Sequence, residues 1–281
     1  MPVLKVKDIE LEYVEYGSGD RYLLCSQQHH FSLVNYTKDL ADKGFHVFNI
    51  TIRGYGRSTR IKEDLGDTWY DVWAQDTVDF ADAMGIDKFF YTGVSHGAGI
   101  GWYLCLKYPE RIRGFFGVVA GPHSKDGVET GEARMRTIKA AATQETWDAY
   151  CDEIENRTRP VRKPEMSDEE WEFRMQMFAE EMAFWRGMSL EEARLNVRKP
   201  FPKQKTEEEL IALLSTVTVP TLLLGGMHDD ISLPKNLLRS CAAVKNSKLV
   251  LYENATHALD REHKEEIVED ILGFCRTRNL F

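Results

Sequence analysis

The chain has 281 residues, 43% hydrophobic and 11% aromatic, which is enough for one globular core with a sizeable insertion. Its formal net charge of −9 would repel nucleic acid and anionic membrane surfaces, so we expect neither as a partner. We expect a small-molecule partner and a monomer or homodimer. The five cysteines form no Cys-x-x-Cys or Cys/His pair, which predicts buried thiols, no metal site and a cytoplasmic location.

In chain order, alternating hydrophobic and polar residues first predict an N-terminal hairpin over 4–16. No leader pattern precedes it, and no apolar run is long enough to cross a membrane. A buried strand is expected over 21–25, a helix over 36–43, a second strand over 46–51 and a long amphipathic helix over 69–84. Strands that alternate with helices predict a mostly parallel sheet covered on both faces.

The segment from Gly93 to Gly97 is Gly-Val-Ser-His-Gly, and it lies between a predicted strand, 88–92, and a predicted helix, 98–106. In this context Gly-x-Ser-x-Gly is the nucleophile elbow, a tight turn with the serine at its apex. The two glycines let neighbouring backbone pass without a β-carbon clash, and the helix N-terminus favours developing negative charge. We therefore predict that Ser95 is a nucleophile.

A serine hydroxyl needs a base to take its proton and an acid to orient that base, and downstream of an elbow these follow in the order acid, then histidine. Strands are predicted over 219–224 and 247–252. The loop after the first carries Asp229 and Asp230, and the loop after the second carries His257. Asp126, after a strand predicted over 114–120, is a further candidate acid.

Residues 128–218 lack strand-like alternation and predict helices, among them 129–143, 145–157 and one from a capping box at Ser167 through Trp185. Another begins at Ser189 and ends before 199–202. We expect this segment to be a helical insertion into a core of residues 1–127 and 219–281. Packing within the insertion accounts for most of its methionines and aromatics, and Trp185 is a candidate contact for a bound small molecule.

These segments together resemble the α/β-hydrolase fold family over nearly the whole chain. The family's acid opens an Asp-x-Ile-x-x-Pro segment, matched at 229–234, which selects Asp229. Its Asn-Ala-x-His loop is matched at 254–257, and its Arg-Gly-x-Gly-x-Ser segment at 53–58. The resemblance implies an α/β fold with a mostly parallel central sheet, flanking helices and a helical cap, a triad and no cofactor. The triad residues are Ser95, Asp229 and His257.

The resemblance also implies an oxyanion hole, with one donor at the backbone N–H of His96. The other donor normally follows a His-Gly at the end of an early strand, where this chain has Ser26-Gln27. The main-chain N–H of Gln28 is therefore the candidate second donor, with Gln27 close behind. Four residues beside this site are candidate substrate contacts: Gln27, His29, His30 and His123.

The function implied is hydrolysis of a small carboxylic ester or lactone through an acyl-enzyme. Epoxide hydrolases and dehalogenases of this fold need a carboxylate nucleophile at the elbow, so Ser95 excludes both. Three alternatives use the same fold: a carbon–carbon bond hydrolase of a ring-cleavage diketone, a cofactor-free oxygenase, and a non-catalytic receptor for a small ligand. The oxygenase shares the Ser-His dipeptide of the elbow.

Overall fold

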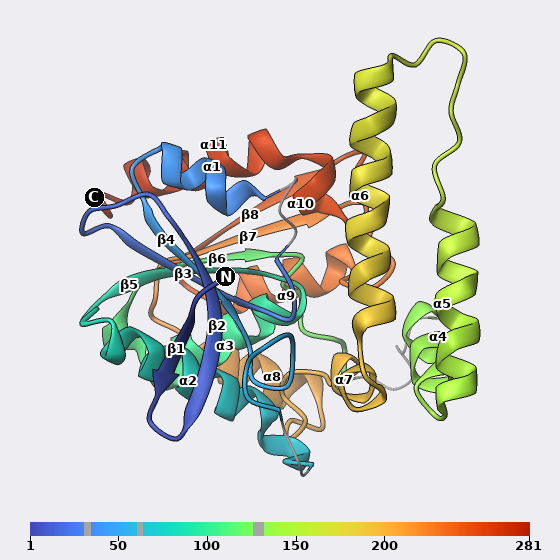
Figure 1. The fold of residues 1–281 in the computed structure, drawn as a ribbon. Helices are drawn as coiled ribbons and strands as arrows, with labels where there is room; N and C mark the ends of the chain where they lie inside the picture. Colours follow the sequence, from blue (N-terminus) through green and yellow to red (C-terminus); the bar gives the residue numbers. More distant parts are fainter. Residues whose placement is uncertain (31–34, 61–63, 126–131) are drawn as a thin grey trace. The chain divides into compact units, whose positions relative to one another are not determined.

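The computed structural model describes residues 1–30, 35–60, 64–125 and 132–281 (Figure 1). The candidate acid Asp126 lies outside these residues. The chain divides into two compact units, one of which holds residues 132–198 and the other the rest of the described chain. Within the described part, no helix combines the length and the hydrophobicity that a membrane span requires.

Eight strands form the sheet of the first unit, in the order β1-β2-β4-β3-β5-β6-β7-β8. β1 and β2 are antiparallel to their neighbours, and the other six strands are parallel to one another. The predicted mostly parallel sheet is therefore confirmed, and six strands end at one edge. The strands are β1 Val3–Val6, β2 Ile9–Tyr16, β3 Tyr22–Gln27, β4 His46–Thr51, β5 Phe89–Val94, β6 Ile112–Val118, β7 Thr221–Gly226 and β8 Ser247–Tyr252.

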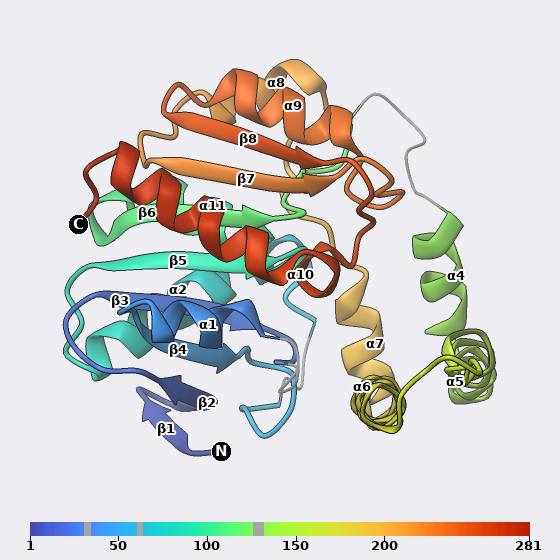
Figure 2. The same ribbon diagram turned by 90° about the horizontal axis from the view of Figure 1, so that it is seen from above.

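Helices cover both faces of this sheet, with α1 and α11 on one face and α2, α3 and α9 on the other (Figures 1 and 2). The longer ones are amphipathic: in α11 the buried positions recur every three or four residues, as a helix on a sheet requires. The helices of this unit are α1 Tyr36–Asp42, α2 Trp69–Ala83, α3 His96–Lys107, α8 Glu207–Leu214, α9 Pro234–Ala243, α10 Leu259–Glu262 and α11 Lys264–Thr277, with short 3-10 turns at Gly66–Thr68 and Pro109–Arg111.

The core between the sheet and α11 is built from side chains that alternate along the strands. Phe90 of β5 and Phe116 of β6 stack with ring centroids 5.7 Å apart, and Phe274 of α11 meets Phe116 edge-on at 6.3 Å. All three rings are fully buried. This packing fixes β5 and β6 relative to each other, and the elbow follows β5 directly.

Four helices form the part of the second unit that the structure describes, residues 132–198, and polar side chains set where three of them begin. Thr143 caps the second helix. Ser167 accepts a hydrogen bond from the N–H of Glu170 at the start of the third helix. Ser189 forms a reciprocal capping box with Glu192 at the start of the fourth helix. The helices are α4 Glu132–Ala140, α5 Gln144–Thr158, α6 Asp168–Gly187 and α7 Leu190–Asn196.

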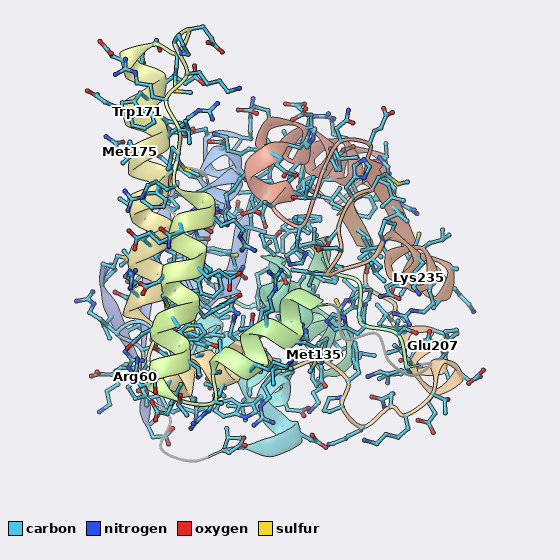
Figure 3. The ribbon with its side chains drawn as sticks, turned by 90° about the vertical axis from the view of Figure 1, so that its right-hand side faces the viewer. Arg60, Met135, Trp171, Met175, Glu207 and Lys235 are labelled. Atoms are coloured by element: carbon cyan, nitrogen blue, oxygen red, sulfur yellow. The ribbon has the colours of Figure 1, made fainter. Side chains whose placement is uncertain are left out.

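Residues 199–218 belong to the first unit, although the predicted insertion extended to residue 218. Contacts of Glu207 in α8, labelled in Figure 3, explain this assignment. Its carboxylate accepts hydrogen bonds from the Lys125 N–H and from the Arg239 guanidinium of α9. Lys125 Nζ also donates to the carbonyl of Phe201 at 2.8 Å. These contacts fasten the segment that returns from the second unit onto the sheet unit.

Candidate active site

The turn between β5 and α3 has the geometry of a nucleophile elbow. Ser95 lies there with φ 50° and ψ −102°, a conformation that costs a non-glycine residue about 1–3 kcal/mol. A β-carbon on Gly93 would lie 2.4 Å from the carbonyl carbon of Gly97, so the turn tolerates no side chain there. The Ser95 N–H donates to the carbonyl of Val118 at 2.9 Å, which anchors the apex of the turn to β6.

Three side chains that are far apart in sequence form a continuous hydrogen-bond chain at the carboxyl ends of β5, β7 and β8. His257 Nε2 lies 2.9 Å from Ser95 Oγ, and His257 Nδ1 lies 2.9 Å and 3.0 Å from the two carboxylate oxygens of Asp229. A carboxylate only accepts hydrogen bonds, so Nδ1 carries the proton and Nε2 is left to accept the Ser95 hydroxyl proton. This is the arrangement that a general base requires.

The side chain of the predicted acid, Asp229, is held rigidly. Asp229 is 2% exposed, and its Oδ1 accepts hydrogen bonds from the N–H groups of Ile231 and Ser232 at 2.8 Å each. Its neighbour Asp230 is exposed. The local turn thus presents Asp229, and not Asp230, to the histidine. The N–H of His228 donates to the carbonyl of Ala255 at 2.9 Å, which ties the acid loop to the histidine loop.

At the predicted oxyanion hole, His96 is the first residue of α3, so its N–H points out of the N-terminal end of that helix. Gln28 follows the end of β3, in the bend that the spacing predicts for the second donor. The role of Gln28 as second donor stays a prediction.

The side chain of Gln27 makes a contact that the sequence did not predict. Its Nε2 donates to the carbonyl of Val94, the residue before Ser95, at 3.0 Å. Because that carbonyl only accepts, the amide nitrogen is the end of the side chain that faces it. Oε1 is buried without a hydrogen-bond partner among the described residues, and a β-carbon on Gly97 would lie 1.7 Å from it.

The ring of His96 lies in an aromatic cluster on α2. Tyr70 stacks on it with ring centroids 5.1 Å apart, and Trp73 meets it edge-on at 4.7 Å. The Trp73 indole donates to the carbonyl of Arg53 at 3.0 Å, and the Arg53 guanidinium pairs with Asp76. The Arg-Gly-x-Gly-x-Ser segment therefore packs behind the elbow. Burial raises the pKa of Asp76 to about 6 against the pull of Arg53.

Three histidines were predicted as substrate contacts, and their surroundings in the structure differ. His30 donates from Nε2 to the carbonyl of Ile50 at 3.0 Å, and burial lowers its pKa to about 4, so it is neutral at pH 7. This contact with β4 favours a structural role for His30. His29 is partly buried beside Gln28, and His123 is partly buried in the segment that follows β6.

Trp185, the predicted substrate contact of the insertion, packs inside the second unit. Its ring lies 6.1 Å from that of Trp147 and 5.3 Å from that of Phe184. Nearby, Phe178 and Met182 of α6 pack with a residue of α5, and Met175, one turn after Trp171 (Figure 3), adds to this cluster. These residues thus form a core of their own unit, and packing within the inserted segment is what the sequence predicts for most of its methionines and aromatics.

Comparison with known proteins concerns the family and the fold of the chain. A family model described as alpha/beta hydrolase fold matches residues 32–259. Bifunctional epoxide hydrolase 2 of Sus scrofa is 32% identical over 113 residues, which are 40% of this chain and 20% of that protein. Epoxide hydrolase B of Mycobacterium tuberculosis is 33% identical over 87 residues, 28% of this chain and 22% of that protein. The chain thus matches about a fifth of the length of these relatives.

Among solved structures, an enol-lactonase from Burkholderia xenovorans LB400 has a TM-score of 0.75 at 20% identity, covering 98% of this chain and 100% of that one. A thermophilic esterase from Thermogutta terrifontis has a TM-score of 0.74 at 18% identity, covering 99% of each chain. At these identities the similarity concerns the fold.

Proposed function

Because this chain belongs to the α/β-hydrolase fold family, we propose that it is a serine-dependent hydrolase that cleaves a small carboxylic ester or lactone through an acyl-enzyme. The observation that carries the proposal is the hydrogen-bond chain from Asp229 through His257 to Ser95, with each contact at 2.9–3.0 Å. A base already within reach of the serine proton is what nucleophilic catalysis by serine needs.

In the first half of the reaction, Ser95 Oγ attacks the carbonyl carbon and its proton passes to His257 Nε2. Asp229 stabilises the imidazolium that forms. The N–H groups of His96 and Gln28 would hold the oxyanion, and one such donor is worth about 3–4 kcal/mol. His257 then returns the proton to the leaving alcohol. In the second half, a water molecule gives a proton to His257 and attacks the acyl carbon, and His257 returns that proton to Ser95 Oγ as the bond to the serine breaks and the acid leaves.

An ester or lactone suits this chemistry better than an epoxide. The curated relatives are epoxide hydrolases, but they match only part of this chain, and the elbow residue here is Ser95 rather than the carboxylate that epoxide opening needs in this fold. A structural neighbour that covers almost the whole chain is an enol-lactonase. That likeness makes a lactone a natural member of the test panel.

We also propose that the second unit selects the substrate. The chain leaves the sheet unit after the carboxyl end of β6 and returns before β7, and Ser95 follows the carboxyl end of the adjacent strand β5. Segments that emerge at this edge of an α/β sheet commonly shape its binding site.

Steady-state kinetics with a defined panel tests the proposal: p-nitrophenyl esters of short and long acids, a lactone and a ring-cleavage diketone, each with oxygen uptake recorded. Turnover of esters or the lactone without oxygen uptake is the expected result. Ser95→Ala and His257→Ala should each abolish nearly all turnover, and the double variant should be little worse than either. Turnover of the diketone alone, oxygen uptake, or binding without turnover would each replace the proposal by one of the three alternatives.

A further inference from the structure

A second carboxyl group lies close to the catalytic histidine. Asp260 belongs to α10, the four-residue helix that begins two residues after His257. The side chain is partly buried, and in the described part of the chain it forms no ion pair and no hydrogen bond with another residue. A carboxylate that leaves water without a partner costs free energy, so its position calls for a reason.

The other inward-facing acids of the sheet unit all have partners. Glu12 pairs with Arg57 at 2.7 Å, Asp76 with Arg53, and Asp79 with Lys7. Within α10 itself, Glu262 accepts hydrogen bonds from the N–H and hydroxyl of Thr256 at 2.7 Å and 2.6 Å. Asp260 differs from these acids in having no such contact.

The groups on which its charge acts show which elements lie near the carboxyl. They are Cys25 of β3, Tyr36 at the start of α1, and His257, with Arg261 and Glu262 on its own helix. Cys25 and Tyr36 are 3% and 4% exposed, so the charge of this partly buried carboxyl acts on buried side chains of β3 and α1 as well as on His257. Burial raises the pKa of Asp260 above its usual value, while the nearby Arg261 and His257 lower it.

We propose that Asp260 binds a hydrogen-bond donor of the substrate, a hydroxyl or an ammonium group a few bonds from the carbonyl that Ser95 attacks. The inference rests on the proposed esterase chemistry. The carboxyl shares the carboxyl edge of the sheet with the triad and keeps its acceptor oxygens available. A hydroxyl or ammonium group would supply the partner that the protein itself does not. Substrates of this class are hydroxy or amino esters, or a hydroxylated lactone.

The test compares three esters that differ in one group: p-nitrophenyl butyrate, 3-hydroxybutyrate and 3-aminobutyrate. The measured quantity is the ratio of kcat/KM for each substituted ester to that for the plain one. A hydrogen bond to a carboxylate should give the wild type a preference of about 10-fold or more for at least one substituted ester. Asp260→Leu should reduce this preference to about 2-fold or less, and Asp260→Asn should retain part of a hydroxyl preference but none for ammonium.

Asp230→Asn is the matched control, because it removes an exposed carboxylate beside the triad and should leave every ratio unchanged. An equal preference in the wild type and in Asp260→Leu would overturn the proposal.

The wild type also provides a test that needs no variant. The ammonium preference should fall as the pH is lowered through the titration of Asp260. A constant ratio across that range would contradict the proposal.

Failure of the esterase chemistry gives a different pattern, in which none of the three esters is turned over faster by the wild type than by Ser95→Ala. Calorimetry with Ser95→Ala protein then tests Asp260 by binding alone, using methyl butyrate, methyl 3-hydroxybutyrate and methyl 3-aminobutyrate. The assignment is supported if Ser95→Ala binds a substituted ester more tightly than methyl butyrate and the double variant Ser95→Ala, Asp260→Leu shows no such difference. Equal binding of all three esters refutes it.

Discussion

The side-chain amide of Gln27 occupies the space that a β-carbon on Gly97 would need: that carbon would lie 1.7 Å from Gln27 Oε1 and 2.6 Å from the carbonyl oxygen of Ser26. The last glycine of the elbow is therefore required by the end of β3 as well as by the turn itself. Two atoms block the same position, one on a flexible side chain and one on the backbone.

Gly97→Ala should destabilise the protein by about 1–3 kcal/mol and impair turnover, because β3 or α3 must shift to admit the methyl group. Adding Gln27→Ala should not restore the protein, since the Ser26 carbonyl still lies 2.6 Å from the new carbon. Urea unfolding of both variants measures the change in stability, and ester kinetics measure the change in turnover. Full recovery in the double variant would mean that the side chain alone excludes the methyl group.

Gln27→Met should lower kcat about 10-fold with KM nearly unchanged, because it removes the donor that holds the Val94 carbonyl beside the nucleophile. Gln27→Glu should be more damaging, since a carboxylate oxygen would face that carbonyl. Steady-state kinetics on both variants separates kcat from KM. A rise in KM alone would instead make Gln27 a substrate contact.

His30 should make the protein sensitive to mild acid. Its pKa is lowered from 6.5 to about 4 in the fold, so the unfolded chain binds the proton first as the pH falls. Its contribution to stability is complete above pH 6.5 and declines by about 3 kcal/mol between pH 6.5 and pH 4. His30→Gln keeps a donor for the Ile50 carbonyl without titrating. The stability of the wild type relative to this variant should fall over that range, as measured by urea unfolding at each pH.

Asp76 acts in the opposite direction, since its raised pKa makes the fold bind a proton between about pH 6 and pH 3.8. It is present in both proteins, so its contribution cancels in the comparison. A pH-independent difference between the wild type and His30→Gln would show that His30 is not held neutral by burial.

Trp185→Ala should weaken the second unit by about 2 kcal/mol, because the ring packs against Trp147 and Phe184. Hydrogen exchange should accelerate in α5 and α6 and stay constant in β5 to β8, which belong to the other unit. Phe173→Ala on the same helix is the control, since that ring is 46% exposed and its loss should change little. Unchanged exchange in α5 and α6 would show that the ring does not support this unit.

The parts of the site that sequence reasoning predicted are local ones. A strand, a Gly-x-Ser-x-Gly turn and a helix specify the elbow within about twenty residues, and Asp229 and His257 each follow a short apolar strand. The mostly parallel sheet follows from alternating strands and helices, and the family match agrees with it.

The parts that sequence reasoning missed depend on contacts between distant segments. Nothing in the residues around Gln27 shows that its amide crosses to Val94 and Gly97, and nothing near Asp260 shows that its charge acts on Cys25 and Tyr36. The attachment of residues 199–218 to the sheet unit depends on such contacts too, because Glu207 is fastened by partners on two other segments.

Mass spectrometry of the protein after reaction with an ester is the most direct test of the central claim, that Ser95 is the nucleophile. Rapid mixing with excess p-nitrophenyl acetate and acid quenching should trap one acetyl group on the peptide that contains Ser95. Ser95→Ala should carry no acetyl group and show no turnover. Undiminished turnover by Ser95→Ala, or an acetyl group on another residue at the rate of turnover, would contradict the account.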